Sequence, residues 1–427
     1  MAEILLYGIN YAPEPIGVGR YSGELGTYLA AAGHAVTVVT APPHYPEWQV
    51  KPPFAAHRYR ATREAGVRVL RCPIVVRRRI AGLWRLLAPI SFALSSAPVL
   101  AWQAIRRRPH TVLCVEPTLL CAPLGLLMAR LVGARAVLHV QDLELDAAFA
   151  VGHLKGRRLR RWAEAFERAL LRRFDGVVAI SLKMQDKLLA KGVDPERVCI
   201  VRNWVDLGQV CPLGRPSLFR EVLGLSPDAF VLLYAGSIGS KQALEIVLDA
   251  ADAMADDPRA VFVIAGDGPE KEKLMARYGA LPNVRFLPLQ PEERLNELLN
   301  LADMHVLPQH QGIADLVLPS KLGGMLASGK RILVTADPGT ELHGFLDGIA
   351  SLVPAGDTAA LVREIRICLD ADRDPGPAGR AKAAASLSRE GCLGAFERVL
   401  AAPVRGRRAR SDTGTVSVHG LPGPPSP

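Results

Sequence analysis

Apolar runs and segments with helical spacing of apolar positions alternate along most of the chain, beginning at its first residues. This alternation predicts parallel α/β units. In the first half the predicted strands are 3–9, 35–40, 67–72, 111–116, 135–140, 176–181 and 197–201. In the second half they are 230–236, 260–268, 283–289, 304–309, 330–336 and 350–356. The pattern therefore predicts an α/β protein with two doubly wound sheets.

The pattern breaks once between the two series, at a stretch with three prolines that we interpret as a linker, 206–228. We expect an N-terminal Rossmann-like domain over 1–205 and a C-terminal one over 229–377. A helical segment over 378–402 follows. Residues 403–427 hold too few large apolar side chains to fold, so we expect a disordered, basic tail rich in Pro and Gly.

Length and composition narrow the class of protein. A chain of 427 residues, 49% of them hydrophobic and 22% charged, is longer than one core usually takes. Its seven cysteines include no C-x-x-C pair and no histidine at zinc-finger spacing, so neither a structural zinc nor a disulfide framework is expected. No basic segment precedes an apolar stretch at the N-terminus, so we expect no secretory signal and a cytoplasmic protein.

The net charge of +10 is unevenly distributed. Residues 1–211 contain 29 Lys and Arg against 16 Asp and Glu, whereas residues 212–402 contain 19 against 25. A basic half attracts nucleic acid, anionic lipid headgroups or a phosphorylated substrate. Because no nucleic-acid-binding motif accompanies the charge, nucleic acid is not an expected partner.

Two stretches of the basic half could contact a membrane. Residues 86–105 carry no charge and are flanked by arginines, which permits a transmembrane helix by length. Two prolines, three serines and the α/β pattern on both sides favour instead a buried helix, or a helix with one face in the bilayer. Residues 155–174 carry eight Lys and Arg on a helical pattern, which indicates either a solvated helix or a membrane-surface helix. We expect peripheral association with the inner face of the cytoplasmic membrane.

The first predicted turn contains glycines that would let a phosphate approach the backbone. In 10–25, Gly17 and Gly19 precede a predicted helix, whose first amides and dipole would attract an anion. A plain tight turn is the alternative. The segment is not a dinucleotide fingerprint, because Ser22 stands where the third glycine belongs.

A second strand, glycine turn and helix follow in 234–251, with Lys241 at the predicted helix start. An ammonium group there would neutralise the diphosphate of a nucleotide and stabilise it as a leaving group. A surface lysine is the alternative. The glycine-containing loop in 265–274 could also approach a ligand closely.

These segments, together with NVRFLPL (283–289) and LADMHVLPQ (301–309), resemble the family 4 glycosyltransferases of the GT-B fold over residues 3 to about 400. Within that resemblance, VQDLELDAA, VRNWVD and DLVLPSKL are similar to the colanic-acid-type exopolysaccharide branch, whose members are described as fucosyltransferases. The resemblance implies two Rossmann-like domains facing across a cleft. It also implies a nucleotide sugar held mainly by the C-terminal domain, an acceptor held mainly by the N-terminal domain, and retaining transfer without a metal or cofactor.

Site residues are assigned by position. The resemblance implies that the diphosphate and donor sugar contact Gly17, Gly19, Gly236, Ser237, Lys241, Ser320 and Lys321. It implies that the nucleoside lies against Gly266, Gly268, Pro269, Arg285, Leu287 and Pro288. From the residues themselves, we expect Lys241 and Asp142 to be catalytic, with Asp142, Glu144 and Asp146 after a strand and a helix cap as the alternative for Asp142. His44, Glu47 and Gln141 are expected on the acceptor side, with a proline-stiffened loop as the alternative for the first two.

The chain departs from the family at three positions. Gly324 stands where the second glutamate of the E-x7-E element commonly binds ribose, and the first falls near Asp315 or Leu316. Ser237 replaces an arginine of the diphosphate loop, and Gln141 replaces a histidine. Recognition of the ribose and the donor sugar must therefore differ from the family pattern.

The resemblance predicts transfer of fucose or another hexose from a GDP- or UDP-linked donor to a polyprenyl-diphosphate-linked exopolysaccharide intermediate. Other exopolysaccharide assembly enzymes are further candidate partners. Retention without an enzyme nucleophile requires the leaving diphosphate to assist on the same face of the sugar, while the protein positions groups and stabilises charge. Two alternatives share the fold: a nucleotide-sugar 2-epimerase, and a degenerate module that binds lipid or a partner transferase.

Overall fold

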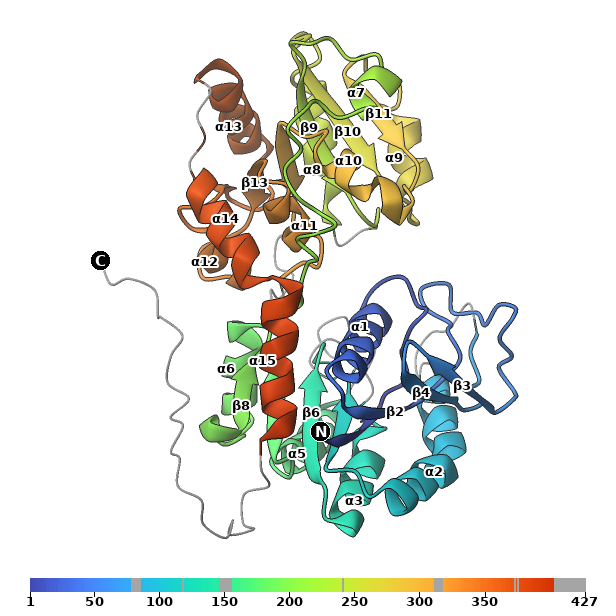
Figure 1. The fold of residues 1–427 in the computed structure, drawn as a ribbon. Helices are drawn as coiled ribbons and strands as arrows, with labels where there is room; N and C mark the ends of the chain where they lie inside the picture. Colours follow the sequence, from blue (N-terminus) through green and yellow to red (C-terminus); the bar gives the residue numbers. More distant parts are fainter. Residues whose placement is uncertain are drawn as a thin grey trace.

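The computed structural model describes residues 1–77, 86–116, 119–143, 145, 156–239, 242–310, 318–371, 374 and 376–402. It consists of two sheets, one in each half of the chain, with helices on both faces of each sheet (Figure 1). The predicted doubly wound α/β architecture is confirmed. Lys241, Glu144, Asp146, Asp315, Leu316 and the predicted tail lie outside the described residues.

Within these residues the N-terminal sheet has eight strands in the order β3-β4-β2-β1-β5-β6-β7-β8. They are β1 (Glu3–Tyr7), β2 (Ala35–Thr40), β3 (Arg60–Glu64), β4 (Val67–Arg71), β5 (Thr111–Val115), β6 (Arg135–Val140), β7 (Gly176–Ala179) and β8 (Val198–Ile200). The helices are α1 (Val18–Ala31), α2 (Leu87–Arg107), α3 (Ala122–Val132), α5 (Arg157–Leu171) and α6 (Leu182–Ala190), with the 3-10 turn η2 (Pro195–Arg197). All strand pairs are parallel except β3 with β4.

The C-terminal sheet has six described strands in the order β11-β10-β9-β12-β13-β14, all parallel. They are β9 (Phe230–Ala235), β10 (Ala260–Ala265), β11 (Val284–Leu287), β12 (Met304–Leu307), β13 (Arg331–Thr335) and β14 (Ser351–Val353). The helices are α7 (Phe219–Val222), α8 (Leu244–Asp252), α9 (Lys271–Tyr278), α10 (Leu295–Leu299), α11 (Leu322–Ala327), α12 (Glu341–Leu346), α13 (Thr358–Ala371), α14 (Pro377–Ser386) and α15 (Arg389–Ala401), with the 3-10 turn η4 (Glu292–Arg294).

The hairpin of β3 and β4 contains a strand that the apolar pattern does not predict. Most residues of β3 are exposed or half-buried at the edge of the sheet, so no apolar run marks the strand. Ala65 and Gly66 between the two strands both have positive φ, as a two-residue hairpin turn requires. Arg71 holds the hairpin from inside, because its buried guanidinium pairs with Glu64 at 2.5 Å.

The long apolar helix α2 belongs to the helical layer of the N-terminal domain. Its inner face buries Phe92 and Leu100 against the sheet, and the hydroxyl groups of Ser96 and Tyr7 share a hydrogen bond of 2.8 Å. Among the described helices, α2 is the one with the length and apolar composition of a membrane span, and a third of its most apolar window is buried. We therefore interpret α2 as a docked helix with one outward face.

The two halves of the chain are joined twice. Val205, just before the predicted linker, forms a parallel bridge with Ser388, and its N–H donates to the carbonyl of Leu387 at 2.8 Å. This pairing divides the predicted C-terminal helical segment into α14 and α15. Helix α15 then lies on the N-terminal domain (Figure 1), where Phe396 is buried and the carbonyl of Leu400 accepts from the hydroxyl of Thr111 at 2.9 Å.

Candidate functional site

The strand orders locate one binding edge in each sheet. β1 lies between β2 and β5, and β9 lies between β10 and β12. Successive strands are therefore added to the sheet on one side of β1 and then on its other side, and the same holds for β9. Open α/β sheets bind ligands at the carboxyl ends of strands at such points. Gly17 follows β1 and Gly236 follows β9, so both predicted phosphate loops lie at these points.

The glycine loops of the C-terminal domain pack backbone against backbone. Gly236 and Gly266 have φ near +150°, and a Cβ on Gly266 would lie 1.9 Å from the carbonyl oxygen of Gly236. Gly268 has φ +157°, and a Cβ there would lie 2.1 Å from the carbonyl oxygen of Ile238. These positions require glycine for both conformation and space.

Several amides of these loops are used within the protein. Gly236 N–H donates to Ala265, and Ile238 N–H donates to Asp267, both at 2.9 Å. Gly266 N–H donates to the carbonyl of Leu287 at 3.2 Å, which brings the ends of β10 and β11 together. These amides are not available to an anionic ligand. Positive charge at the loops after β9 and β10 must therefore come largely from a side chain.

Lys321 supplies that charge. Its ammonium group lies 4.1 Å from the centroid of the Tyr234 ring and donates to the Tyr234 hydroxyl at 2.6 Å. That hydroxyl donates in turn to the carbonyl of Ser237 at 2.5 Å. Lys321 Nζ is 3.2 Å from the Cβ position of Gly236, so it touches the predicted diphosphate loop. Burial lowers the pKa of Lys321 to about 8.

Of the other residues predicted to bind the donor, some lie near the Gly236 loop and others do not. Ser320 and Lys321 open α11 beside the Gly236 loop, and Pro288 follows Leu287 at the end of β11. Arg285 does not join them, because its guanidinium donates to the carbonyls of Pro282 and Val284 at the opposite end of β11. Gly324 contacts Leu299 from α11, so this position carries no polar group that could bind ribose.

A buried carboxylate organises the N-terminal glycine loop. Glu14 accepts hydrogen bonds from the backbone N–H groups of His44 and Tyr45 at 3.0 and 3.1 Å, and from the Asn10 amide at 2.9 Å. A Cβ on Gly19 would lie 2.4 Å from this carboxylate, so glycine is required. Glu14 thus fixes the loops after β1 and β2 to each other.

Two predicted acceptor-side residues differ in environment. The ring of His44 is buried, with Nδ1 2.9 Å from the carbonyl of Pro42 and 3.5 Å from Glu14. Glu47 is exposed and forms an ion pair with Lys51 at 2.8 Å. His44 therefore lies in the loop assembly that Glu14 holds, whereas Glu47 lies on its outer side.

Gln141 links the end of β6 to the segment that follows β8. Its amide exchanges two hydrogen bonds of 3.0 Å with the amide of Asn203, and its Nε2 lies 3.1 Å from His139 Nε2. Burial lowers the pKa of His139 to about 3, so this imidazole is neutral at physiological pH. Asp142 follows Gln141 and is exposed. The substitution of Gln for the family histidine thus creates a matched pair of amides.

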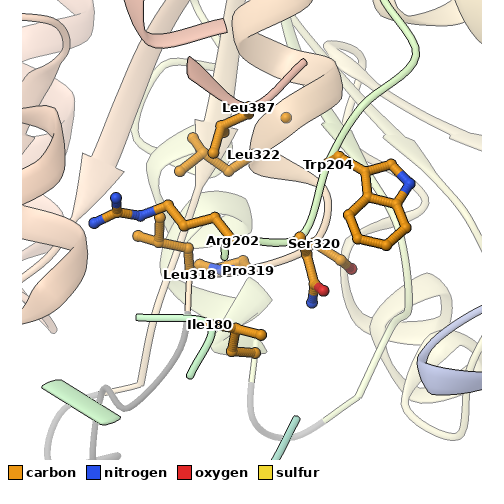
Figure 2. A pocket seen from close by; sticks show the side chains of 10 residues that line it. Ile180, Arg202, Trp204, Leu318, Pro319, Ser320, Leu322 and Leu387 are labelled. Atoms are coloured by element: carbon orange, nitrogen blue, oxygen red, sulfur yellow. The ribbon is translucent and has the colours of Figure 1, made fainter. Parts of the chain in front are cut away.

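A small pocket lies where the two domains meet (Figure 2). Arg202, Asn203 and Trp204 line it from the segment after β8, and Pro319 and Ser320 line it from the segment before α11. Figure 2 shows Leu322 and Leu387 next to each other at one end of the pocket. The predicted donor residue Ser320 and the partner of Gln141 therefore face one interdomain space.

Glu341, at the start of α12 in the C-terminal domain, caps a helix of the N-terminal domain. Its carboxylate is buried and accepts from the backbone N–H groups of Leu182 and Lys183 in α6 at 3.1 and 3.0 Å. It also pairs with Arg202 at 3.1 Å. A carboxylate at a helix N-terminus is favoured both by the dipole and by amides without partners.

The sequence prediction missed Glu14 and Glu341. An acid between two prolines, or at the first turn of a helix, has the pattern of a solvated group. The signal available for Glu14 is its place between the first strand and Gly17, at an edge where ligands bind. No group of three or more potential metal-ligating side chains occurs within the part of the chain that the structure describes.

Comparisons with known families match both halves of the chain. Residues 17–204 match a glycosyl transferase 4-like domain, and residues 229–371 match glycosyl transferases group 1. The colanic acid biosynthesis glycosyl transferase WcaI of Escherichia coli K12 is 42% identical over 378 residues, which cover 86% of this chain and 92% of that protein. The probable glycosyltransferase WbjE of Pseudomonas aeruginosa is 27% identical over 276 residues, covering 61% of this chain and 67% of that protein.

Solved structures with the same fold cover nearly the whole chain. Sucrose-phosphate synthase from Thermosynechococcus elongatus has a TM-score of 0.69 at 18% identity, covering 93% of this chain and 98% of its own. HepE from Anabaena in complex with UDP-glucose has a TM-score of 0.66 at 14% identity, covering 94% of this chain and 99% of its own. At these identities the likeness shows the fold.

Proposed function

The chain belongs to the family 4-like glycosyltransferases of the GT-B type, and from this premise we propose that it transfers a hexose with retention from a nucleotide-diphosphate donor to a lipid-linked exopolysaccharide intermediate. The reaction is proposed to occur at the inner face of the cytoplasmic membrane, with fucose as the first candidate sugar. The observation that carries the proposal is the half-buried ammonium of Lys321 against the glycine loop at the end of β9.

The donor side is supported by charge and space. Glycines at 236, 266 and 268 hold the loops after β9 and β10 in close contact, and the Lys321 ammonium beside Gly236 is the group that would bind the diphosphate oxygens. Lys241 is proposed as a second cation of this site; it lies outside the described residues. The similarity to HepE, whose structure contains UDP-glucose, makes a uridine or guanosine nucleotide a reasonable test.

The acceptor side is supported by the N-terminal loops. Gly17 precedes α1 with φ +67° and has no side chain, so the first amides of α1 are left for the donor diphosphate, next to which the acceptor would bind. Glu14 and His44 hold these loops in place. The likeness to WcaI, which is named for colanic acid biosynthesis, supports an exopolysaccharide acceptor.

In the proposed reaction, the bond between the sugar anomeric carbon and the diphosphate oxygen breaks, and an acceptor hydroxyl forms the new bond on the same face. The hydroxyl proton passes to the leaving diphosphate. Lys321, Lys241 and the first amides of α1 stabilise the charge that develops on the diphosphate. Asp142 is proposed to orient the donor sugar or the acceptor, with Gln141 and Asn203 fixing the preceding strand end.

The direct test incubates the purified chain with GDP- and UDP-linked sugars and a polyprenyl-diphosphate-linked acceptor. We expect a lipid-linked product with the anomeric configuration of the donor, measured by mass spectrometry and NMR. Consumption of the donor without a lipid-linked product would contradict the proposed acceptor. Conversion of the free nucleotide sugar without any acceptor would instead indicate the 2-epimerase.

The base of the nucleotide donor can be identified first, by measuring the melting temperature of the protein with GDP and with UDP. A nucleotide that binds only the folded protein raises the melting temperature, and the better ligand raises it more at equal concentration. We expect a shift with one of the two nucleotides. No shift with either would favour a degenerate module that has lost donor binding.

A further inference from the structure

Four described helices, α2, α3, α5 and α6, cover one face of the N-terminal sheet. The connections from β4 to β5, from β5 to β6 and from β6 to β7 run in the same direction, so their helices α2, α3 and α5 lie on the same side. All three contribute to one buried core. Arg130 of α3 pairs with Asp175, just after α5, at 3.0 Å. We call the outer surface of α2, α3 and α5 the three-helix face.

On α2 the outward side is apolar. Its exposed large side chains are Ile90, Leu94, Trp102 and Ile105, spaced by four, eight and three residues so that they lie along one side of the helix. The buried side includes the polar side chains of Ser96 and Gln103. The buried side also holds Phe92 and Leu100, so α2 is apolar on both sides, whereas a surface helix that meets only water is polar on its outer side.

The neighbouring helices extend the apolar surface. Leu127 and Leu131 are exposed on α3, and Leu120 is exposed just before it. Trp162 and Phe166, one helical turn apart, are exposed on α5. Large apolar side chains exposed on three helices of the same sheet face point to an interaction site.

On the three-helix face, the charged residues of α2 and α3 are all positive. No acidic residue occurs in α2 or α3, whereas Arg106 and Arg107 end α2 and Arg130 lies on α3. On α5, Glu167 is buried in an ion pair with Lys191, and the half-buried Glu164 pairs with Arg160 at 2.7 Å. Exposed arginines of α5 are Arg158, Arg160, Arg161 and Arg168. A partner that fits this face is apolar inside and anionic at its surface.

We infer that the three-helix face lies on an anionic lipid bilayer, with the apolar side chains of α2 in the boundary between headgroups and acyl chains and the arginines at lipid phosphates. A second copy of the chain fits poorly, because a two-fold interface would bring arginines against arginines. Each of the three helices begins at the carboxyl edge of the sheet, so the bilayer would border the acceptor-side loops. The choice of a bilayer as partner rests on the proposed function.

Vesicle binding tests the face without any sugar transfer. The full chain is sedimented with vesicles of phosphatidylglycerol and phosphatidylcholine, with no donor present. We expect binding to the mixed vesicles, weaker binding at high salt, and a partition coefficient about tenfold lower in Leu94→Gln and in Ile105→Gln. Val222→Gln is the matched control, because Val222 of the C-terminal domain and Ile105 are both 64% exposed. It should bind like the parent chain.

Insertion is measured separately by tryptophan quenching. If the α2 side chains enter the bilayer, brominated acyl chains should quench the fluorescence of Trp102. The parent chain should then lose more fluorescence than Trp102→Phe. Unchanged binding in both α2 variants, or no quenching difference, would overturn the inference. So would a dimer in solution that Leu94→Gln dissociates. A chain that binds vesicles but yields no lipid-linked product would leave this inference standing and contradict the proposed acceptor, so the two can fail independently.

Discussion

At the scale of single residues, the protonation of Lys321 connects structure with ligand binding. Its ordinary pKa of 10.5 is lowered to about 8 by burial, so the ammonium form is lost as the pH rises through about 8. A diphosphate binds the charged form only. Nucleotide affinity should therefore fall as the pH passes this value, a decrease that a fully exposed lysine would show only near its ordinary pKa.

Calorimetric titration with the preferred nucleotide at about pH 7 and about pH 9 checks this dependence. We expect roughly tenfold weaker binding at the higher pH in the parent chain. Lys321→Met should bind weakly at both values, and Lys321→Arg should lose the dependence because guanidinium stays charged. Lys273→Met, on an exposed lysine of α9, is the control. A dependence that persists in Lys321→Met would assign the titration to another group.

Gly266 tests the close packing of the donor loops. Gly266→Ala places a methyl group 1.9 Å from the Gly236 carbonyl at φ +150°, so we expect a loss of unfolding free energy of about 3 kcal/mol or more. Gly214→Ala is the control, since a Cβ there meets no atom within 4 Å. Chemical denaturation measures both. Equal stability of the two variants would mean that the loops separate readily.

At the scale of elements, Glu341 makes the arrangement of the two domains depend on one carboxylate. It holds the first turn of α6 and Arg202, both of which lie outside its own domain. Burial excludes water as a replacement partner. The contact therefore contributes to the domain arrangement as well as to the stability of α6.

Glu341→Gln removes the charge and turns an amide N–H₂ toward backbone donors. We expect about 2 kcal/mol less stability of the interdomain contact, seen as faster hydrogen exchange in the first turn of α6. Small-angle scattering should show a wider distribution of domain separations. The matched control is Glu272→Gln in the first turn of α9, where the carboxylate is exposed. Unchanged exchange in Glu341→Gln would show that the remaining contacts suffice.

The comparison of elements also shows what a sequence can reveal locally. Buried parallel strands such as β2 and β6 match the predicted ranges 35–40 and 135–140, because a strand buried on both faces has a continuous apolar run. The edge strand β3 has no such run and was missed. The apolar segment 86–105 predicted a helix, and α2 was found there, but only packing decided which of its faces is exposed.

At the scale of the whole molecule, the last described helix stabilises the first domain. Phe396 of α15 is fully buried among side chains of the N-terminal sheet and packs edge-on against His139, with ring centroids 4.8 Å apart. The chain thus enters the C-terminal domain at the linker and returns through α15. The core of the N-terminal domain therefore includes a helix that follows the C-terminal domain in the chain.

Phe396→Ala should destabilise the N-terminal domain by about 3 to 5 kcal/mol, because it removes a buried aromatic ring and leaves a cavity. Hydrogen exchange is expected to rise in β1 and β5 and to change little in β9 and β10. Ile367→Ala, on the half-exposed surface of α13 in the other domain, is the control. A loss confined to the C-terminal sheet would contradict the assignment of α15 to the N-terminal domain.

The sequence by itself determined the two α/β halves, the glycine turns after β1 and β9, and the basic character of the first half, because periodicity, glycine and charge are local properties of the chain. The tertiary structure alone decided that Glu14 joins two loops, that Glu341 caps a helix of the other domain, that Arg285 points away from the donor loops, and that α2, α3 and α5 share one face. These relations depend on strand order and on crossings between distant segments, and no local pattern encodes which distant segments meet.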